Sequence, residues 1–358
     1  MVVAAGGTGG HLFPGIAVAD FLLANYPGSK VLFVGTDRMI DAAVLKDKEF
    51  ERATLKSYGL KGKSMQEKIK ALAQLPLSVI SAVRILRRFK PDVALGVGGY
   101  VTGPTLLAAK LLGLPTCIHE QNSVPGLANR LLGKIVDQIF ISMPGSERYF
   151  PAGKMYLTGN PVRQDLLDKA ALPEKKKNDV AVLLVLGGSQ GAHRINELVV
   201  EVVRNNKNKF QTAIHLIHQT GAHDESWVKK QYHSFGVKAE VHAFISDMGS
   251  LYEIADLVLS RAGATTLAEI TVMKKPCILI PYPYAADDHQ EKNGQYLVAG
   301  KAAKMFRQTD LTAERLGEEI IGLLGDTKEL RRMSDASSKL AKGEAAETIV
   351  QRCLAMVN

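Results

Sequence analysis

A chain of 358 residues is long enough for two domains at roughly 150 residues per domain. Its 46% apolar and 23% charged residues are typical of a globular protein and exclude a long disordered or low-complexity segment. The net charge of +9 is concentrated in residues 1–160, where 19 Lys and Arg face 11 Asp and Glu, whereas the remainder holds 26 against 25. The basic half predicts an anionic partner, which could be nucleic acid, a phosphorylated ligand or an anionic membrane surface.

Cysteine usage and hydropathy indicate a cytoplasmic location. Cys117, Cys277 and Cys353 show no C-x-x-C spacing and no paired framework, so a reducing compartment is expected. The first residues lack a charged region followed by a cleavage site, and no uncharged apolar run reaches about 18 residues. We therefore expect neither a cleaved leader nor a membrane-spanning helix.

Strands and helices alternate through the first half of the chain. The opening MVVAAGGTGGH is an apolar run that ends in glycines, and apolar residues with helical spacing follow from Pro14 to Asn25. Further buried strands are predicted at 30–35, 91–96, 116–119 and 138–141. This alternation predicts parallel βαβ units with helices on both faces of a sheet.

The same pattern restarts after a polar, proline-bearing stretch, GNPVR at 159–163 followed by PEKKKND at 173–179. A strand at 179–186 leads into GGSQGA, and a helix is predicted through 195–203. The remaining predicted strands are 212–217, 240–243, 257–260 and 277–280. We place the domain boundary near Pro161. The sequence thus predicts an α/β protein of two Rossmann-like parallel-sheet domains that face a cleft, with ligands at the carboxyl ends of the strands.

Three glycine-rich loops are candidate anion sites: GGTGGH (6–11), GVGGYVTGP (96–104) and GGSQGA (187–192). A glycine-rich turn that opens a helix exposes N–H groups and the positive end of the helix dipole, which suits a phosphate or diphosphate. Any one of these loops could be a tight strand-to-helix turn that binds no ligand. Three such loops in one chain are harder to explain as turns alone. None of them has the G-x-G-x-x-G spacing of a dinucleotide site, and Gly62-Lys63-Ser64 lacks the first glycine of a phosphate-binding P-loop.

Eight strings in one order carry a resemblance to a known family. They are GGTGGHLFP (6–14), VGGYVTGP (97–104), HEQNSVPG (119–126), GNPVR (159–163), GGSQGA (187–192), FISDM (244–248), SRAGATTLAEI (260–270) and DDHQEKN (287–293). Together they resemble the MurG family of UDP-N-acetylglucosamine–N-acetylmuramyl-(pentapeptide) pyrophosphoryl-undecaprenol N-acetylglucosamine transferases. That family is similar to two-domain glycosyltransferases of the GT-B fold.

The resemblance implies a division of labour between the domains. Residues 1–161 would form the acceptor and membrane-docking domain, 162–340 the UDP-sugar donor domain, and 341–358 a helix that returns to the N-terminal domain. The main chain at Ile245 would read the uracil, and Glu269 would hold the ribose hydroxyls, because a carboxylate accepts two hydrogen bonds from a diol. The implied donor-binding set is Arg163, Gly188, Ser189, Gly191, Ile245, Ala264, Glu269, His289, Gln290 and Asn293.

The acceptor side is implied in the same way. The set on the acceptor or sugar side is Thr8, Gly9, Gly10, Tyr100, Glu120 and Asn122, and His11 is the candidate catalytic base. An unperturbed histidine pKa of about 6.5 leaves the ring mostly neutral at cytoplasmic pH, as a base requires. Taken alone, His11 could instead cap a helix, Glu269 could be an exposed helical residue, and Arg163 a linker charge. Core packing is the better explanation of Cys117.

No metal or cofactor is expected. Asp287, Asp288 and His289 contain metal-ligand types, but one local cluster is weak support for a metal site. The leaving diphosphate would be stabilised by the amides of Gly188–Gly191 instead.

A basic segment suggests how the protein meets its lipid substrate. Residues 60–90 hold eight Lys and Arg against Glu67 alone, and Leu60, Met65, Ile69, Leu72 and Leu75 could line an apolar face that is interrupted at Pro76. Basic residues beside apolar ones suit an interfacial helix on anionic lipid, although an ordinary domain helix has the same pattern. No nucleic-acid motif or aromatic stacking platform is present, so nucleic acid is not an expected partner.

The resemblance implies an inverting hexosyltransferase. It would move N-acetylglucosamine from UDP-N-acetylglucosamine to the C4 hydroxyl of the N-acetylmuramyl unit of lipid I, giving lipid II, as a peripheral enzyme on the cytoplasmic face of the cell membrane. Two alternatives stay open: another GT-B transferase that uses a UDP-sugar, and a catalytically silent UDP-sugar-binding protein.

Overall fold

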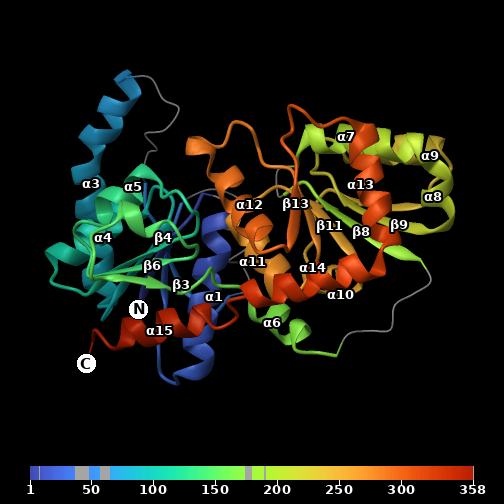
Figure 1. The fold of residues 1–358 in the computed structure, drawn as a ribbon. Coiled ribbons are helices and arrows are strands. Elements are labelled where there is room, and N and C mark those ends of the chain that lie inside the picture. The colour runs from blue at the N-terminus through green and yellow to red at the C-terminus, as the bar shows by residue number, and fades with distance from the viewer. Residues whose placement is uncertain (8, 37–47, 57–64, 174–179, 189–190, 358) are drawn as a thin grey trace. The chain divides into compact units, whose positions relative to one another are not determined.

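The computed structural model describes residues 1–7, 9–36, 48–56, 65–173, 180–188 and 191–357, which form two compact units (Figure 1). The first unit comprises Met1–Gln164 and Lys342–Asn358, and the second comprises Asp165–Ala341. The chain therefore leaves the first unit once and comes back to it. The unit borders lie at 164/165 and 341/342. The sequence pattern predicted the first border at 161/162, and the family resemblance implied the second at 340/341.

The first unit is built on a parallel sheet. The described strands run in the order β3-β2-β1-β4-β5-β6-β7. Its elements are β1 (Val2–Ala5), α1 (Gly9–Asn25), β2 (Leu32–Gly35), β3 (Glu51–Thr54), α3 (Met65–Phe89), β4 (Ala94–Gly98), α4 (Thr102–Leu111), β5 (Thr116–Glu120), α5 (Leu127–Leu132), β6 (Gln138–Ile141), a 3₁₀ turn (Glu147–Tyr149), β7 (Met155–Leu157) and α15 (Ala345–Leu354).

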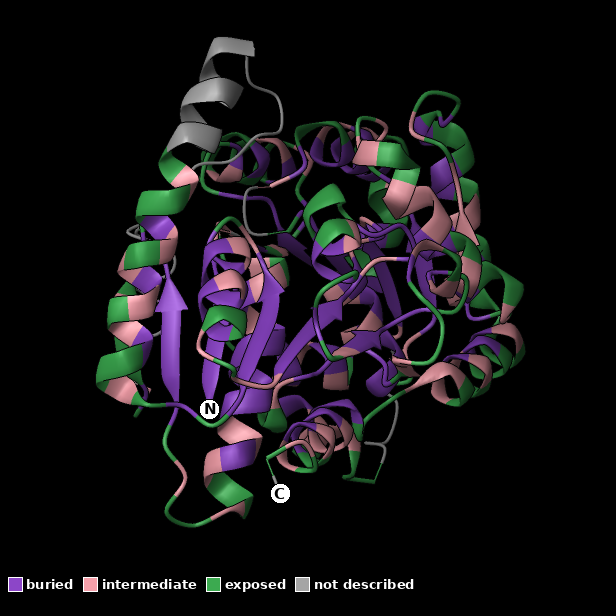
Figure 2. Ribbon diagram, turned by 90° about the vertical axis from the view of Figure 1, so that its left-hand side faces the viewer, coloured by how far each residue is buried: buried purple, intermediate pink, exposed green. Residues whose placement is uncertain are grey.

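Strand side chains alternate between two helical layers, because successive residues of a strand point to opposite faces. Val3 and Ala5 of β1 pack in a cluster with α1 and α15, and Val2 and Ala4 pack in a cluster with α3, α4 and α5. Figure 2 shows buried strands inside and helices whose outer faces are exposed. Near α15, the sulfur atoms of Cys117 and Cys353 lie 3.7 Å apart in the buried core. The C-terminal helix is thus part of the first unit's core.

The second unit repeats the architecture. Its described strands are all parallel and run in the order β10-β9-β8-β11-β12-β13. Its elements are α6 (Gln164–Ala170), β8 (Ala181–Leu186), α7 (His193–Asn205), α8 (Lys207–Thr212), β9 (Ile214–Gln219), α9 (Glu225–Ser234), β10 (Ala239–His242), α10 (Met248–Ile254), β11 (Leu257–Ser260), α11 (Ala264–Val272), β12 (Cys277–Leu279), a 3₁₀ turn (Ala286–Asp288), α12 (His289–Ala299), β13 (Ala303–Met305), α13 (Ala313–Gly325) and α14 (Thr327–Leu340). The prediction of two parallel-sheet α/β domains is confirmed.

The sequence pattern did not predict three of the described strands, and all three lie at the edge of a sheet. The strands β3, β7 and β13 end their sheets and are partly exposed, so they lack the continuous apolar run of an inner strand. Pro76 does not end the helix, because α3 runs through it. Proline removes one hydrogen bond of a helix, and the burial of Ala82 and Leu86 beside α4 holds the following turns in place. The Gly62-Lys63-Ser64 string lies outside the described residues.

No helix in the described parts of the chain combines the length and the apolar character needed to cross a bilayer.

Candidate active site

The carboxyl ends of β1 and β4 meet in the first unit, and glycines make the approach possible. A Cβ added at Gly99, whose φ is +84°, would overlap the carbonyl oxygen of Gly6. Thr102 fastens the two loops together, because its buried hydroxyl donates to Ala4 O at 3.1 Å and accepts from Gly98 N at 3.1 Å. The glycine-rich strings at 6–11 and 96–104 therefore form one layer at the end of the sheet.

His11 lies in the first turn of α1, beside this layer. Its imidazole packs on the backbone of Gly98, where an added Cβ would come within 2.7 Å of ring atoms Cγ and Cε1. Its Nδ1 lies 3.1 Å from Oε1 of Gln121, the residue that follows β5. The ring is partly exposed, so it is held from two sides and still reachable.

Glu120 and Asn122 organise the loop after β5. Glu120 is 2% exposed, and its carboxylate accepts hydrogen bonds from the backbone and side chain of Asn122 and, at 2.8 Å, from Asn129 Nδ2. Burial raises the pKa of Glu120, and these hydrogen bonds oppose that rise. The sequence did not single out Asn129, which ties α5 to this carboxylate. The predicted acceptor-side residues Glu120 and Asn122 thus share one hydrogen-bonded unit.

The other predicted acceptor-side residues frame the same end of the sheet. Gly9 and Gly10 open α1, and Tyr100 is 43% exposed in the turn before α4. Thr8 lies outside the described residues.

The glycine-rich loop between β8 and α7 is fixed to the end of β9 in the second unit. Gly187 N donates to Gln219 O at 2.9 Å, and Gln219 Nε2 donates to Gly188 O at 3.0 Å. Gly191 has a φ of +80°, and a Cβ there would overlap the carbonyl oxygen of Thr220. This places Gly188 and Gly191 directly before the N-terminus of α7, as an anion site requires. Ser189 lies outside the described residues.

A histidine network that the sequence did not reveal adjoins this loop. His193, the first residue of α7, has Nδ1 at 2.9 Å from Asp224 Oδ2, and His223 Nδ1 lies 2.9 Å from Oδ1 of the same carboxylate. Asp224 also accepts from the buried Asn196, and it raises the pKa of His193. Asp224 thus joins His193, Asn196 and His223 in one hydrogen-bonded group at the start of α7.

Glu269 and Ile245 flank the ends of β10 and β11. Glu269 lies on α11 and accepts at Oε2 from the hydroxyl of the fully buried Tyr252 of α10 at 3.2 Å. The predicted Ala264 is buried as the first residue of α11. Ile245 is 9% exposed in the loop between β10 and α10, so only its main chain suits ligand reading. Three predicted donor-side residues therefore lie after β10 and β11, which are separated in the sheet by β9 and β8.

Arg261 holds the loop after β12 by hydrogen bonds. The sequence did not single out this residue, although it lies in the SRAGATTLAEI string. Its guanidinium donates to Ile280 O at 3.0 Å, to Pro281 O at 3.1 Å and to Gln308 Oε1 at 2.7 Å. Burial lowers the pKa of Arg261 to about 10. The sequence signal that could have identified it is an arginine directly after a buried strand.

The predicted sugar-side residues all lie on α12, the helix that follows this loop. His289 Nδ1 contacts Ala286 O at 2.9 Å, and Gln290 Oε1 accepts from Tyr282 N at 2.9 Å, which orients the Gln290 amide NH₂ away from that contact. Asn293 is fully buried, and its Nδ2 donates to Ala262 O at 3.3 Å. Asn293 therefore joins α12 to the strand end rather than presenting its amide to solvent.

Arg163 is placed differently from the other predicted donor residues. It belongs to the first unit, and its guanidinium lies 5.0 Å from the centre of the Phe13 ring on α1. Arg163 is therefore not one of the residues that the second unit itself places near its strand ends.

The described residues contain no group of three or more His, Cys, Asp and Glu arranged to hold a metal ion. Asp287 and Asp288 are exposed and adopt positive φ values of +52° and +51° at the turn before α12.

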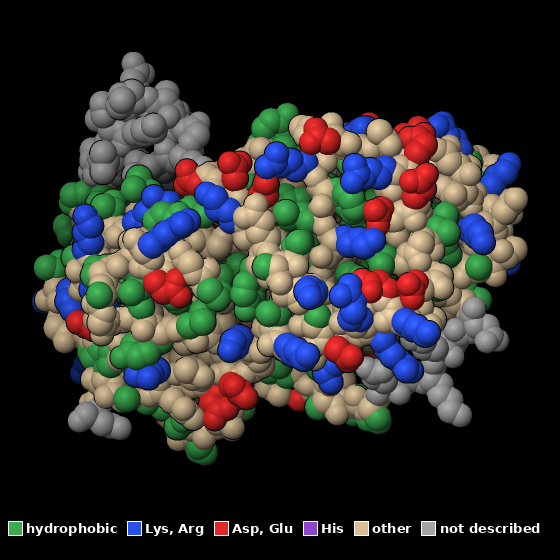
Figure 3. Space-filling view, in the orientation of Figure 1, with side chains coloured by type: hydrophobic (Ala, Val, Ile, Leu, Met, Phe, Trp, Pro, Cys, Tyr) green, Lys and Arg blue, Asp and Glu red, His purple; other side chains and the backbone are tan. Residues whose placement is uncertain are grey.

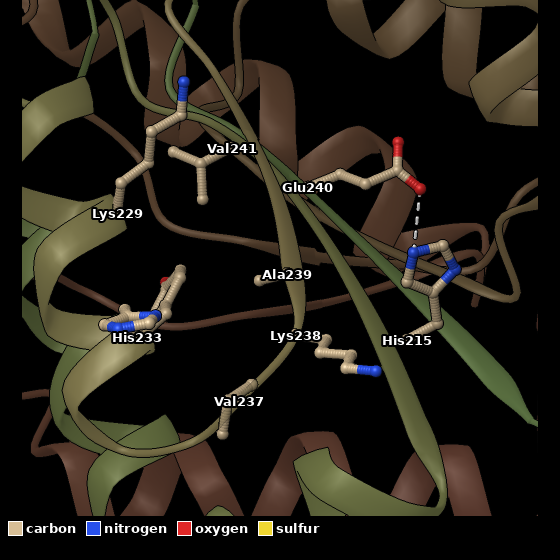
Figure 4. Close-up of a pocket in the computed structure, with 9 residues that line it drawn as sticks. His215, Lys229, His233, Val237, Lys238, Ala239, Glu240 and Val241 are labelled. Atoms are coloured by element: carbon tan, nitrogen blue, oxygen red, sulfur yellow. Dashed lines mark ion pairs between the residues drawn. The ribbon is translucent and has the colours of Figure 1, made fainter.

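A separate pocket of about 580 Å³ lies near the amino ends of β9 and β10 (Figure 4). His215 and Glu240 form an ion pair of 2.9 Å across its wall. It is therefore at the opposite end of the strands from the glycine loop, and none of the predicted site residues lines it.

Comparison with known proteins agrees with the two-unit division. Residues 1–141 match the glycosyltransferase family 28 N-terminal domain, and residues 182–351 match the glycosyltransferase family 28 C-terminal domain. The UDP-N-acetylglucosamine--N-acetylmuramyl-(pentapeptide) pyrophosphoryl-undecaprenol N-acetylglucosamine transferase of Desulfotalea psychrophila is 49% identical over 358 residues, covering 100% of this chain and 97% of the relative. The transferase of the same name from Geobacter sp. strain M21 is 44% identical over 98% of this chain and 94% of the relative.

Among solved structures, Acinetobacter baumannii MurG superposes with a TM-score of 0.77 at 29% identity, covering 99% of each chain. The resemblance found in the eight strings thus extends from end to end of the sequence and through both sheets. The chain belongs to glycosyltransferase family 28 and, within it, to the MurG transferases, which have the GT-B fold.

Proposed function

We propose that this chain transfers N-acetylglucosamine from UDP-N-acetylglucosamine to the C4 hydroxyl of the N-acetylmuramyl unit of lipid I, with inversion at the anomeric carbon. Lipid II for peptidoglycan synthesis is the product. The observation that carries the proposal is the end-to-end similarity to transferases of that name, together with an imidazole held at the end of β1.

His11 is the proposed base. The C4 hydroxyl attacks the anomeric carbon from the face opposite UDP while His11 takes the hydroxyl proton, and UDP leaves with the electron pair of the broken C–O bond. A positioned imidazole suits this task because an unperturbed imidazole, with a pKa of about 6.5, is mostly neutral near pH 7. The carboxylate of Glu120 is the weaker candidate, since it is buried and already accepts from Asn122 and Asn129.

The second unit is the proposed donor domain. Glu269, oriented by Tyr252, would accept from the ribose hydroxyls, and the main chain of Ile245 would read the uracil. Gln290 has its oxygen engaged with Tyr282 N, so its NH₂ group can donate to the sugar. His289 and Ala264 would complete this wall, with Asn293 held behind it by its hydrogen bond to Ala262 O, and Arg163 is the remaining predicted donor-side residue.

Charge on the leaving diphosphate would be stabilised at the N-terminus of α7. Gly188 and Gly191 are held on either side of this site, because Gly188 O accepts from Gln219 Nε2 and Gly191 packs on the Thr220 carbonyl. Preorganised N–H donors do not need to reorient as the charge develops, which is the main source of electrostatic catalysis.

The proposed membrane-docking surface includes an exposed stripe on α3. Leu77, Ile80, Arg84, Arg87 and Arg88 are exposed, and at 100° per residue they fall on one side of the helix. Figure 3 shows hydrophobic and basic side chains interspersed on one face of the first unit. Apolar residues beside arginines suit the interface of an anionic leaflet, so we place the enzyme peripherally on the cytoplasmic face of the cell membrane.

A vesicle experiment tests this stripe. Arg84, Arg87 and Arg88 are replaced with Ser in the full chain, and sedimentation with anionic and neutral vesicles is compared. Each arginine near an anionic surface contributes about 1 kcal/mol, so binding to anionic vesicles should fall at least tenfold while activity on a water-soluble acceptor is kept. Equal binding of both proteins to both vesicle types contradicts the proposal. Lys61, Lys63, Lys68 and Lys70, the other predicted contributors, lie outside the residues whose side chains are described.

The reaction is tested with the purified full chain, UDP-N-acetylglucosamine and a short-chain lipid I analogue. We expect a disaccharide product and stoichiometric UDP. Transfer to other acceptors but not to this analogue would support a different UDP-sugar transferase. Donor binding without turnover or hydrolysis would identify a silent binding protein. His11→Ala should lower kcat by about 10²–10⁴-fold, the range of a general base, with UDP affinity little changed.

A further inference from the structure

Gln121 occupies a buried position between two histidines. It follows the last residue of β5 directly and is 2% exposed. Its side chain reaches Val97 on β4, His119 on β5 and His11 on α1. A side-chain amide has two N–H donors and one oxygen acceptor. Its orientation therefore decides which neighbour faces an N–H donor and which faces the oxygen acceptor.

The neighbours allow only one orientation of this amide. The Val97 carbonyl oxygen lies 2.6 Å from the Gln121 nitrogen, and a carbonyl oxygen can only accept. The NH₂ group must therefore face β4. Its second hydrogen is directed at His119 Nδ1, which is 3.0 Å away. The Gln121 oxygen is then left to face Nδ1 of His11 at 3.1 Å.

His119 supports the same orientation from its other side. Its Nε2 lies 3.1 Å from the carbonyl oxygen of Gly159, which can only accept, so Nε2 carries the proton. The hydroxyl of Ser142, 3.0 Å from Nε2, can accept from it as well. Burial lowers the pKa of His119 to about 4, so the ring is neutral near pH 7 and its Nδ1 is an acceptor. The donor and the acceptor are therefore fixed in each hydrogen bond that links Gly159, His119 and Gln121.

We propose that Gln121 is a positioning residue that holds neutral His11 in the tautomer with its proton on Nδ1, so that Nε2 is the basic nitrogen. The reason is that the amide oxygen can only accept, and which ring nitrogen of a histidine is protonated is set by the hydrogen bond that the other nitrogen makes. The ring cannot turn toward β4, because it packs on the backbone of Gly98. This inference rests on the proposed role of His11 as the base.

The proton balance of the transfer step follows from this tautomer. The acceptor's C4–O–H proton moves to Nε2, the oxygen forms a bond to the anomeric carbon, and the bond from that carbon to the UDP oxygen breaks. His11 becomes an imidazolium with protons on both nitrogens, and its Nδ1–H still donates to Gln121. It later releases the Nε2 proton to water. With the opposite tautomer, Nε2 would already carry a proton and could not accept one.

The first test is the tautomer itself. The full chain is labelled with ¹⁵N-histidine, and the His11 resonances among the nine histidines are assigned by comparison with His11→Gln. Above the pKa of His11, we expect the nitrogen shifts of an Nδ1–H ring. An Nε2–H ring in the wild-type chain would overturn the proposal, whatever the activity of any variant.

The second test separates positioning from folding. Gln121→Met keeps the length of the side chain and removes its polar atoms. We expect kcat to fall by about 10- to 100-fold, less than for loss of the base itself, with KM for UDP-N-acetylglucosamine within about threefold and His11 no longer held as the Nδ1–H tautomer. Gln121→Glu keeps an oxygen acceptor for Nδ1–H, and its carboxyl group, protonated on the oxygen that faces Val97 O, replaces the N–H donor there. We expect its activity to exceed that of Gln121→Met, with the acidic limb of the kcat/KM profile close to that of the wild type.

Controls distinguish the possible failures. Ser146→Ala also removes a fully buried side-chain hydrogen bond in the first unit, to Met143 O, without touching His11, and should keep kcat and the acidic limb. Besides His11, the groups to consider in interpreting the profile are the neutral His119, the buried Glu120 and Arg163 on Phe13. A wild-type kcat in Gln121→Met contradicts the positioning role. Full activity in His11→Ala instead contradicts the proposed base, even where the tautomer is as expected.

Discussion

Gly98→Ala should disable catalysis through the position of His11. The added Cβ would overlap His11 Nδ1 and lie 2.7 Å from Cγ and Cε1, whereas ordinary contacts begin at 3.4 Å, so the ring must retreat by roughly 1 Å. The His11–Gln121 hydrogen bond is 3.1 Å long and tolerates only about 0.4 Å of stretching before it exceeds 3.5 Å. A misplacement of about 1 Å costs on the order of 10²-fold in rate, so we expect a fall in kcat of about that size.

Gly98→Ala should also destabilise the fold. The backbone φ of Gly98 is +136°, a region that side chains other than glycine rarely adopt, and such strain costs about 1–3 kcal/mol. The assay is kcat with a water-soluble acceptor analogue, alongside calorimetric UDP binding and the urea midpoint. UDP binding should be unchanged, because the second unit holds the proposed nucleotide site.

Two other glycines of the first unit serve as controls. Gly113 has a φ of +73° with nothing within 4 Å of an added Cβ, so Gly113→Ala should show the backbone strain without the loss of turnover. Gly103 has neither a positive φ nor a neighbour within that distance, and Gly103→Ala should stay within about 1 kcal/mol of wild type. If folded Gly98→Ala turns over within threefold of wild type, the contact between this backbone and His11 does not position the base.

Three further predictions concern donor binding, the C-terminal helix and pH. Glu269→Ala should weaken UDP binding by about 1–3 kcal/mol in calorimetry, since the ribose hydroxyls would lose their acceptor; unchanged affinity in a folded variant removes Glu269 from the site. Ile349→Ala, at a fully buried position of α15, should lower the free energy of unfolding by about 2–5 kcal/mol in urea, and a loss under 1 kcal/mol would mean that α15 is not part of the core. Burial lowers the pKa of His119 to about 4 and that of His218 to about 3, so the unfolded chain binds protons more readily, and stability present above pH 6.5 is lost as the pH falls toward these values. Each group should remove about 2 kcal/mol between pH 7.5 and pH 5; a urea midpoint that does not fall over this interval contradicts both burials.

Inner strands and glycine loops could be predicted from the sequence because their signals are local. A strand buried on both faces, such as 181–186, shows a continuous apolar run, and the glycines that follow mark the turn into a helix. Edge strands gave no such signal: β3 reads ERAT and is mostly exposed, so its register comes from pairing with β2 rather than from its own residues.

The candidate site was predictable only where motifs carried it. His11, Glu269 and Gln290 were found through the family resemblance, but their orientation depends on Gln121, Tyr252 and Tyr282, which lie 110, 17 and 8 positions away and outside any one motif pattern. The network of Asn196, Asp224 and His193 joins α7 to the segment after β9 and has no local pattern at all. Hydrogen bonds between residues tens of positions apart become visible only when the sheet brings their strand ends together.

The return of α15 to the first unit has a consequence for the order in which the chain folds during synthesis. Domains commonly form in the order in which they leave the ribosome. Here Ile349, Val350 and Cys353, which complete the core around α1, are translated after the whole of residues 165–341. At about 5–20 residues per second, the first unit waits on the order of 10–35 s with the surface of α1 that α15 will cover still open. The second unit can be finished while the first is incomplete, so during this interval the apolar face of α1 that α15 covers stays exposed to solvent.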